Sequence, residues 1–541
     1  MDDILDVLQV GYGPVGQMHA AKLGRMGHRV AAYERFHDQY KLSRAGHFDH
    51  EVMRFLQSID CATAVAEDAF PMTKYEFRNA VGETLITLDW DAPSVSGWKS
   101  DYLFYQPYME AALDHAARAS GSVEVHRGWE AIALVQHADH VALTVRRTRA
   151  DGGAEPQGEQ RTVKARYLVG ADGANSFVRK AVGPDMEDFG FRENWLVGDF
   201  KPKRPLTMAF DNGQICDPKR PMCLFQLGLT HRRFEFMVMP GDDLARMQRP
   251  EALWELVNPW ITPDDADLIR QAVYTFQSKL LANWRHDRVL LIGDATHLMP
   301  PFMGQGMCSG MRDATNLAWK LDLVLRGIAS DALLDTYTLE RKPHVHSIIK
   351  QSTELGRVSC TIDPEVAAAR DAAFRSGPAA PPPFPWIEAG IVLKTGSLHA
   401  TAVAGRLGPQ ARVRSVDGRE GLCDDFVGTG WHLIGLGLDR LDLDAASRAL
   451  IDTLRIATVA IDATTGYADV DNFYARYFGN AGLQAVIVRP DFVVYGGVES
   501  LADVDSLLAS LAADLELVGQ GQSGEVSDAG VGTAERIGAP A

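Results

Sequence analysis

The hydrophobic pattern at the start of the chain alternates short apolar runs with a helical periodicity. Residues 5–10 form an apolar run that ends in glycine, residues 14–26 carry a helical pattern, and residues 29–33 form a second apolar run. A strand, a helix and a strand of these lengths make one β-α-β unit, which builds a parallel sheet. We expect the chain to return to this sheet with a strand at 288–292 and a long helix at 311–325.

A different pattern interrupts this unit. Aromatic and aliphatic residues alternate along 75–92 and 195–240, as in strands that bury one face. These segments predict a second, antiparallel domain inserted into the first. Within it we expect a helix to begin at 263–267. We expect the pair Arg232–Arg233 to lie on a solvated turn; the alternative is that it contacts the carboxylate or phosphate of a ligand.

The last third of the chain opens with a proline-rich stretch. Five prolines lie between residues 378 and 385, and such a run forms neither a regular helix nor a central strand. We therefore interpret residues 376–394 as a linker. Strand and helix patterns alternate again over 395–518, which predicts a small α/β domain, and the Gly/Ser/Ala-rich residues 519–541 predict a disordered tail.

The composition mainly excludes certain kinds of partner and location. Lysine and arginine total 54 against 71 aspartates and glutamates, and the formal net charge of −17 argues against a nucleic-acid partner. No apolar run reaches the roughly 18 residues that cross a bilayer, and the acidic N-terminus does not resemble a secretory signal. The six cysteines form no CxxC. We therefore expect a cytoplasmic protein without membrane contact, disulfide framework or metal cluster.

The first turn carries a glycine motif. Residues 11–16 read Gly-Tyr-Gly-Pro-Val-Gly, a GxGxxG between the first strand and the first helix. Gly11 permits the tight turn, Gly13 lets the backbone approach a pyrophosphate, and Gly16 lets the helix pack close to the strand. Glu34 ends the second strand, where a carboxylate holds a ribose hydroxyl. These features predict a dinucleotide site, for either NAD or FAD.

Two later segments decide between these dinucleotides. The apolar strands before Asp172-Gly173 and Gly293-Asp294 each end in a glycine and an aspartate, which can hold a ribityl or ribose hydroxyl of a long, extended cofactor. Pro301 and the glycine-rich residues 304–307 follow and open the long helix, whose N-terminus can place N–H groups beside a reduced flavin. The three segments together favour FAD.

These three motifs, in this order and spacing, resemble the FAD-dependent aromatic hydroxylases, single-component flavoprotein monooxygenases that act on phenols. The resemblance covers residues 5–350 and is greatest to the branch of 3-(3-hydroxyphenyl)propionate hydroxylase and phenol hydroxylase, through residues 104–107, 216–221 and 233–236. It extends to a C-terminal domain that in this branch resembles a thioredoxin fold without its redox cysteines.

The fold expected from the resemblance is mixed α/β with three domains. A Rossmann-like FAD-binding domain would combine residues 1–74, 100–190 and 285–375. An inserted antiparallel-sheet domain for the substrate would combine residues 75–99 and 191–284, and residues 395–518 would form the thioredoxin-like domain.

The resemblance implies an NAD(P)H-dependent FAD aromatic-ring hydroxylase of the EC 1.14.13 type, acting in aromatic catabolism. FAD would be bound tightly but not covalently, NAD(P)H would reduce it, and O2 would then give a flavin C4a-hydroperoxide that hydroxylates a small phenol. It also implies a homodimer formed through the C-terminal domain. The sequence leaves open which phenol is used, whether NADH or NADPH is the reductant, and which ring position reacts.

The family's cofactor contacts carry over onto matching positions. The resemblance places Arg44 near the flavin and pyrophosphate, Gln106 against the cofactor, and Asp172 at both the FAD and the nicotinamide. The complete set of expected FAD-binding residues is Gly11, Gly13, Pro14, Val15, Gly16, Glu34, Arg35, Arg44, Gln106, Asp172, Gly173, Gly293, Asp294, Pro301, Gly304, Gln305, Gly306 and Met307.

Catalytic candidates follow Arg44 closely, and we consider Arg44, His47 and Asp49. His47 is the first candidate for the base that deprotonates the phenol, since histidine accepts protons near neutral pH. The alternative interpretation is a capping cluster, with Asp49 as the N-cap of a helix over 49–56 and a solvated His47. His297 is a further candidate near the flavin, although a structural hydrogen bond is its more ordinary role.

Two other functions compete with phenol hydroxylation. One is another FAD oxidoreductase of the same fold, such as an epoxidase or a tailoring monooxygenase on a larger polycyclic phenol. The chain contains no GWxWxIP-like halogenase segment and no redox CxxxxC after the first helix. The other is a flavin-binding protein without turnover, which the intact set of Arg44, Asp172 and Asp294 disfavours.

Overall fold

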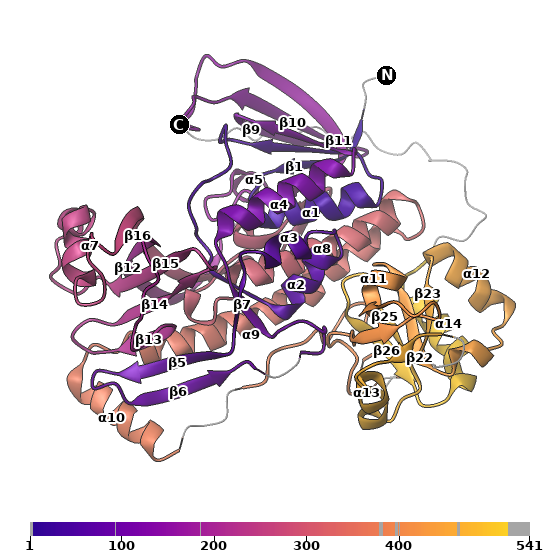
Figure 1. Ribbon diagram of the computed structural model, residues 1–541. Coiled ribbons are helices and arrows are strands. Elements are labelled where there is room, and N and C mark those ends of the chain that lie inside the picture. Colours follow the sequence, from indigo (N-terminus) through magenta and orange to yellow (C-terminus); the bar gives the residue numbers. More distant parts are fainter. Residues whose placement is uncertain are drawn as a thin grey trace.

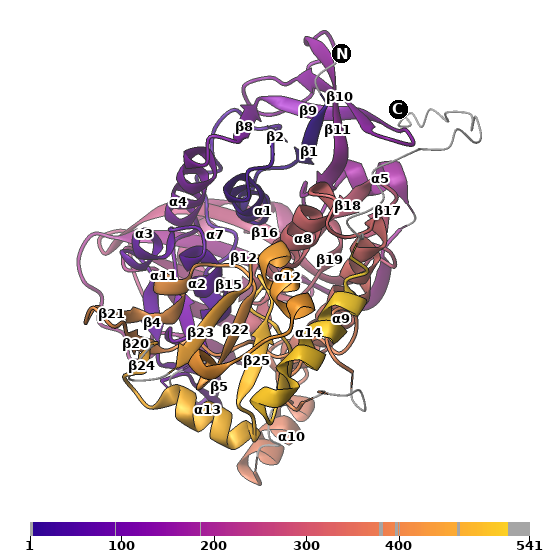
Figure 2. The same cartoon turned by 90° about the vertical axis from the view of Figure 1, so that its right-hand side faces the viewer.

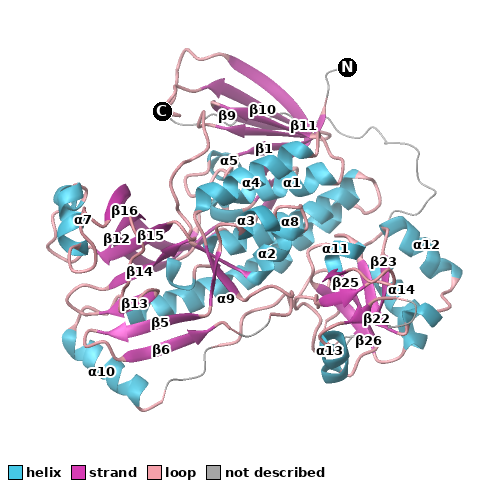
Figure 3. Ribbon diagram, viewed as in Figure 1, coloured by secondary structure: helices cyan, strands magenta, loops and turns pink. Residues whose placement is uncertain are grey.

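The computed structural model describes residues 4–91, 94–183, 185–377, 382–394, 399, 401–461 and 466–517. They form a mixed α/β structure with several sheets (Figures 1 and 3). None of the helices in these ranges is long and apolar enough to span a membrane. The predicted tail, 519–541, lies outside the described residues.

The opening β-α-β unit lies at the centre of the first sheet, as predicted. The opening strand pairs in parallel with the strand that follows it and with a later one. Across this sheet the strands are β17 (Arg285–His286), β18 (Val289–Leu291), β11 (Gln160–Gly170), β1 (Leu5–Val10), β2 (Val30–Glu34) and β8 (Val123–Arg127), with β9 (Trp129–Gln136) and β10 (Val141–Arg147) pairing antiparallel beside β11.

Helices cover this sheet because its strands are apolar on both faces. In Figure 1 they lie directly below β1, and the central one, α8, is buried along nearly its whole length. The helices of this part are α1 (Pro14–Arg25), α2 (His50–Gln57), α3 (Ala62–Ala66), α4 (Gln106–Ala119), α5 (Phe177–Val182), α8 (Gly306–Leu325) and α9 (Asp335–Ser359). Helix α10 (Pro364–Arg375) lies against the second sheet instead.

The second sheet lies to the left in Figure 1 and packs one face against α6 (Leu244–Met247) and α7 (Pro250–Val257). Its strands are β19 (His297–Leu298), β16 (Ala266–Leu280), β12 (Glu187–Pro202), β15 (His231–Met237), β14 (Met222–Leu227), β13 (Gly213–Cys216), β5 (Lys74–Asn79) and β6 (Thr84–Asp89). Its pairs are antiparallel, except that β13 and β5 run parallel. A small sheet of β3 (His47–Asp49), β7 (Asp101–Leu103) and β4 (Phe70–Met72) lies beside it.

Two local predictions for this sheet are wrong. Residues 263–267 do not begin a helix: the Asp265 carboxylate accepts hydrogen bonds from the backbone N–H and the hydroxyl of Thr262, which closes a turn, and strand β16 follows. Arg232 and Arg233 do not lie on a solvated turn but are buried in β15. In both places pairing with distant strands overrode a local polar pattern.

The C-terminal unit, orange to yellow in Figures 1 and 2, covers one side of the molecule (Figure 2). In its main sheet the outer pair β22–β23 is parallel and the other pairs are antiparallel, the topology of a thioredoxin-like fold. The strands across this sheet are β23 (Ala457–Ile461), β22 (His432–Leu436), β25 (Ala485–Val488) and β26 (Val494–Val498). The remaining elements are β20 (Arg412–Arg414), β21 (Glu420–Leu422), β24 (Ala468–Asp469), α11 (Cys423–Val427), α12 (Ala445–Leu454), α13 (Phe473–Ala481) and α14 (Val504–Asp514).

Short 3₁₀ turns complete the described structure. They are η1 (Gly293–Ala295), η2 (Pro301–Met303), η3 (Asp331–Leu334), η4 (Leu438–Arg440) and η5 (Leu501–Asp503). All six cysteines are free thiols, as predicted from their spacing.

Candidate functional site

A cavity of about 2050 Å³ lies between the first and second sheets. Ordinary small-molecule pockets hold roughly 300–1,000 Å³, so this one has room for a large cofactor and a second molecule. Every residue expected to bind FAD or act in catalysis lines it, with the exceptions of Gly293 and of His297, the further candidate. Gly293 lies directly behind the wall, where its N–H donates to Asp313.

The glycine turn after β1 forms one end of the cavity. Gly11 has a φ of +92°, and a Cβ there would overlap the Ala171 carbonyl. Gly13 is different, because its φ is −78° and a Cβ would meet no atom within 4 Å. The protein itself therefore does not require glycine at position 13, whereas a ligand that approaches the backbone would.

The polar residues near this turn fix its shape. The amide of Gln9, a fully buried residue of β1, donates to the carbonyls of Gly11 and Gly16 at 3.0 Å. The Glu34 carboxylate accepts the backbone N–H of Tyr12 at 2.9 Å and that of Phe36 at 3.0 Å. Since a carboxylate offers about four acceptor positions, Glu34 keeps the capacity to accept a ribose hydroxyl.

Arg35 and Asp172 line the cavity but already have partners in the protein. The Arg35 guanidinium donates to the Gly152 carbonyl. Asp172 accepts the Ser176 hydroxyl and the Val178 N–H, so its carboxylate caps α5. Desolvation raises the pKa of Asp172, and these donors oppose that shift.

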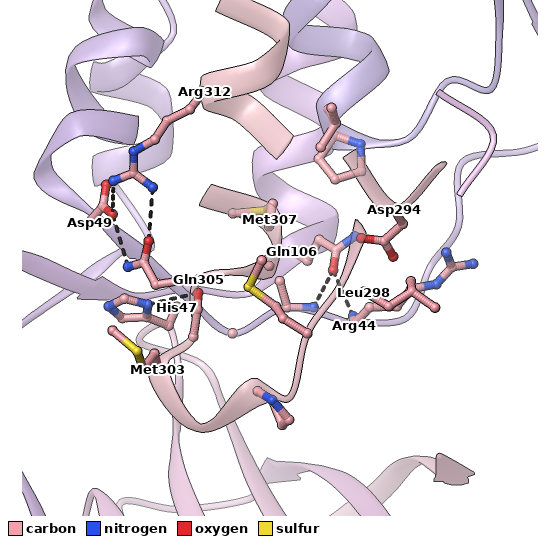
Figure 4. A pocket seen from close by; sticks show the side chains of 18 of the residues that line it. Arg44, His47, Asp49, Gln106, Asp294, Leu298, Met303, Gln305, Met307 and Arg312 are labelled. Carbon is pink, nitrogen blue, oxygen red and sulfur yellow. Dashed lines mark hydrogen bonds and ion pairs between the residues drawn. The ribbon is translucent and has the colours of Figure 1, made fainter. Parts of the chain in front are cut away.

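Gln106, Arg44 and Asp294 meet at one wall of the cavity, as Figure 4 shows. The Gln106 side chain accepts the backbone N–H groups of Arg44 at 2.7 Å and of Ala45 at 2.8 Å, so it holds the loop that carries Arg44. The Arg44 guanidinium lies 4.5 Å from the centre of the Tyr40 ring. Asp294 opens to the cavity; desolvation raises its pKa, and His297 and Arg44 oppose this shift.

A buried cluster supports the strand end that carries Asp294. Asp313 of α8 accepts His297 Nε2 at 2.7 Å, the Gly293 N–H at 3.1 Å and Arg341 at 2.9 Å. His297 is fully buried and paired to Asp313. Its geometry therefore fits a structural hydrogen bond and not a base.

The N-terminus of α8 faces the cavity without a side-chain cap or an acidic residue in its first turn. Gln305, Gly306 and Met307 line the cavity at this point. Free N–H groups and the positive end of the helix dipole are therefore available to an anionic group there.

A buried ion pair anchors this helix end, and Figure 4 shows its members side by side. Arg312 donates to Asp49 at 2.5 Å, to Glu51 at 2.6 Å and to Gln305 at 2.9 Å. Although desolvation would raise the pKa of Asp49, Arg312 and the two neighbouring histidines hold it well below its ordinary value. Asp49 also caps α2 by accepting the Val52 N–H, which confirms the capping interpretation for this residue.

His47 is part of the cavity wall, and its ring is not solvated. Nε2 lies 2.7 Å from the Asp101 carboxylate, Nδ1 lies 3.3 Å from the Gly304 carbonyl, and the ring stacks on Trp90. Desolvation lowers the pKa of His47, whereas Asp101 and Cys308 together raise it, and the net shift is well upward. A cationic imidazole with both N–H groups engaged positions the Gly304 loop and is poorly placed to accept a proton.

We expect Asp101→Asn to destabilise the protein more at low than at high pH. The folded pKa of His47 lies above its ordinary 6.5, so the stability it contributes is fully present below the unfolded pKa and is lost as the pH rises through the folded value. The difference in melting temperature between wild type and Asp101→Asn should therefore be larger at about pH 6 than at about pH 10.

The nearby Asp91→Asn is the matched control for this comparison. Asp91 pairs with Lys99 at the surface, where both side chains are more than half exposed, and an exposed pair contributes at most about 1 kcal/mol. Equal destabilisation by Asp101→Asn at both pH values would contradict a charged His47–Asp101 pair.

The wall opposite the glycine turns is the face of the second sheet turned away from α7. Alternate residues of its strands line the cavity there: Trp195, Val197, Gln214, Cys223, Phe225, Arg233, Glu235, Tyr274 and Phe276. A planar, apolar ring therefore has a surface to pack on beside the α8 N-terminus.

These residues fit FAD. The open space over Gly13, the uncapped N-termini of α1 and α8, and the carboxylate of Asp294, which accepts no hydrogen bond from a described residue, all belong to one cavity. Sequence reasoning did not find Gln9, Asp101, Asp313 or Arg312. A polar residue inside an apolar strand was a signal for Gln9, but the other three act through partners far away in the chain.

Two protein-family models match this chain. The model of the FAD binding domain matches residues 4–352, and that of the HcaD C-terminal domain matches residues 405–514. The chain is 37% identical to a probable NADH-specific resorcinol 4-hydroxylase of Rhodococcus jostii, over 94% of this chain and 95% of the relative. It is 32% identical to a 3-(3-hydroxy-phenyl)propionate/3-hydroxycinnamic acid hydroxylase of Comamonas testosteroni, over 90% and 93% of the two chains.

Solved structures agree at the level of the fold. Aklavinone-11 hydroxylase in complex with FAD and aklavinone superposes with a TM-score of 0.77 at 24% identity, covering 95% of this chain and all of the other. The flavin-dependent monooxygenase PieE superposes with a TM-score of 0.75 at 20% identity over the same shares. From the family match and the full-length relatives, the chain belongs to the FAD-dependent aromatic hydroxylases and is a flavoprotein monooxygenase that uses FAD, NAD(P)H and O2.

Proposed function

We propose that this enzyme hydroxylates a small phenol and takes its reducing equivalents from NADH. The observation that carries the proposal is that a single cavity joins the dinucleotide turns to the aromatic face of the second sheet. The two relatives described above are named for resorcinol and for 3-(3-hydroxyphenyl)propionate, both single-ring phenols, and the first is named as NADH-specific. A small substrate therefore has more support than a polycyclic one.

We propose that FAD lies along the turns at residues 11–16, 172–173 and 293–294, with its ring end at the N-terminus of α8. Residues 1–74, 100–190 and 285–375 would then form the FAD-binding domain, and residues 75–99 and 191–284 the substrate domain. The positions of these segments on the first and second sheets support this division. When bound, FAD supplies hydride acceptance from NAD(P)H and oxygen activation.

The chain's own residues would bind and orient the cofactor and the substrate, and would exclude water from them. Arg312 and Asp49 hold Gln305 and the start of α8 in place, and His47 holds the Gly304 carbonyl. We propose that these residues are positioning residues, and that Arg44, whose guanidinium forms no ion pair within the described residues, contacts the cofactor directly. The predicted homodimer and the cytoplasmic location stay expectations from the sequence.

The test is turnover by the purified, FAD-loaded protein in air. NADH and NADPH oxidation should be followed with a panel of phenols, together with hydroxylated product and hydrogen peroxide. We expect one phenol to accelerate NADH oxidation, with product equal to the NADH consumed. A phenol that accelerates oxidation and yields only peroxide is an effector, and a protein that no phenol stimulates contradicts the proposal.

A further inference from the structure

One carboxyl on the substrate side of the cavity has no role in the site described so far. Glu235 is one of the residues of β15 that face away from α7, and its side chain lines the cavity although the residue is only 7% exposed. Its strand neighbours Phe234 and Phe236 pack into the core on the other face. Glu235 is therefore held in place by the sheet and directed into the cavity.

The Glu235 carboxyl lacks donors of its own. No hydrogen bond reaches it from any residue that the structure describes, and its nearest cation, Arg233, lies 3.6 Å away. Arg233 is already engaged, because it donates two hydrogen bonds to Asp199 at 2.6 and 3.0 Å. Desolvation raises the pKa of Glu235 above its ordinary value. A buried carboxyl without donors is costly, so a ligand that supplies one gains affinity here.

The groups around Glu235 form a polar end to an otherwise aromatic subsite. Cys223 lies opposite Glu235 in the β14–β15 register, and its sulfur is 3.2 Å from the Tyr75 hydroxyl, which also accepts the Gln214 amide at 2.9 Å. The Tyr75 ring lies 5.9 Å from that of Trp90, and Trp90 stacks on His47. These contacts connect Glu235 to the Gly304 loop at the start of α8.

The charges near this end do not suit an acidic substrate. Arg233 and Arg270 both lie against Asp199, Arg312 is paired with Asp49 and Glu51, and His47 is paired with Asp101. A substrate carboxylate placed beside Glu235 would find each of these cations already paired, and the juxtaposition of like charges is unfavourable. A hydroxyl, in contrast, can donate to Glu235.

We propose that the substrate is a neutral phenol that carries a second ring hydroxyl, and that Glu235 determines this specificity by accepting a hydrogen bond from that hydroxyl. This inference rests on the proposed function as a phenol hydroxylase and narrows its substrate class. It excludes phenols whose second substituent is a carboxylate side chain.

The test is equilibrium binding to the FAD-loaded, oxidised protein, read from the change in flavin absorbance without NADH. The probes are resorcinol, 3-methoxyphenol, which lacks the second donor, and 3-(3-hydroxyphenyl)propionate. We expect wild type to prefer resorcinol over 3-methoxyphenol by about 10- to 100-fold, the value of a hydrogen bond to a charged group. In Glu235→Leu this preference should fall to about 1- to 3-fold, and in Glu235→Gln, which keeps an acceptor, it should be intermediate.

Glu193→Gln is the matched control, because Glu193 lies on neighbouring strand β12 but outside the cavity lining. It should keep the wild-type preference, and flavin content shows that each variant is folded. An unchanged preference in both Glu235 variants overturns the role of Glu235, and tighter binding of 3-(3-hydroxyphenyl)propionate than of resorcinol to wild type overturns the neutral substrate. Absence of hydroxylated product from every phenol is a separate result that contradicts the proposed function instead.

Discussion

Replacing Arg489 with leucine is expected to lower the free energy of unfolding by about 3–5 kcal/mol, the cost of leaving buried charges unpaired. Arg489 is fully buried and donates to Asp491 at 2.6 and 3.0 Å, to Glu340 at 2.8 Å and to the Ile391 carbonyl at 2.8 Å. Although desolvation would raise it, Arg489 and Lys320 lower the pKa of Glu340 to about 2. Without Arg489, two buried carboxylates share the single ammonium of Lys320, which lies 3.0 Å from Glu340.

The same substitution at Arg412 is the control, because Arg412 also belongs to the C-terminal unit. Its ion pair with Asp471 has a distance of 3.2 Å, and both side chains are about half exposed, so Arg412→Leu should destabilise the protein much less than Arg489→Leu. Denaturant unfolding of the full, FAD-loaded chain measures both variants. A destabilisation by Arg489→Leu no larger than that by Arg412→Leu would show that the buried network contributes little.

The sequence predicted the structure best where an element depends on residues close to it in the chain. Strand β1 and helix α1 have close to the predicted bounds, because an apolar run, a glycine turn and a 3.6-residue period are local signals. The three glycine motifs identified one site for a related reason. In a parallel sheet the ends of β1, β11 and β18 lie at the same edge, so motifs that follow those strands must converge.

The remaining site residues depend on partners that no local pattern reveals. Arg312 meets Asp49 across 263 positions of the chain, and Arg54 of α2 meets Asp424 across 370. The sequence offered Asp49 both as a catalytic group and as a helix N-cap; the structure shows the cap of α2 and adds the ion pair with Arg312, which no local pattern indicated. Arg233 was misjudged for the same reason, since its counterion Asp199 belongs to another strand.

Valine at position 13 is expected to weaken FAD binding by about 5- to 150-fold while leaving the flavin-free protein as stable as wild type. The φ of −78° suits any residue, and a Cβ at Gly13 meets no protein atom within 4 Å. A side chain there would occupy space that the cofactor needs, and such overpacking costs about 1–3 kcal/mol. Titration of the flavin-free chain with FAD, followed by flavin fluorescence, measures the loss.

Alanine at position 11 separates this ligand effect from a general defect of the turn. With a φ of +92° and a Cβ that would overlap the Ala171 carbonyl, Gly11→Ala should destabilise the flavin-free protein itself by about 2 kcal/mol or more. Positions 11 and 13 lie in the same turn. We nevertheless expect Gly13→Val to lower only the affinity for FAD, and Gly11→Ala to lower the melting temperature of the flavin-free protein. If Gly13→Val bound FAD as wild type does, the cofactor would not approach this turn, and the site would have to lie elsewhere in the cavity.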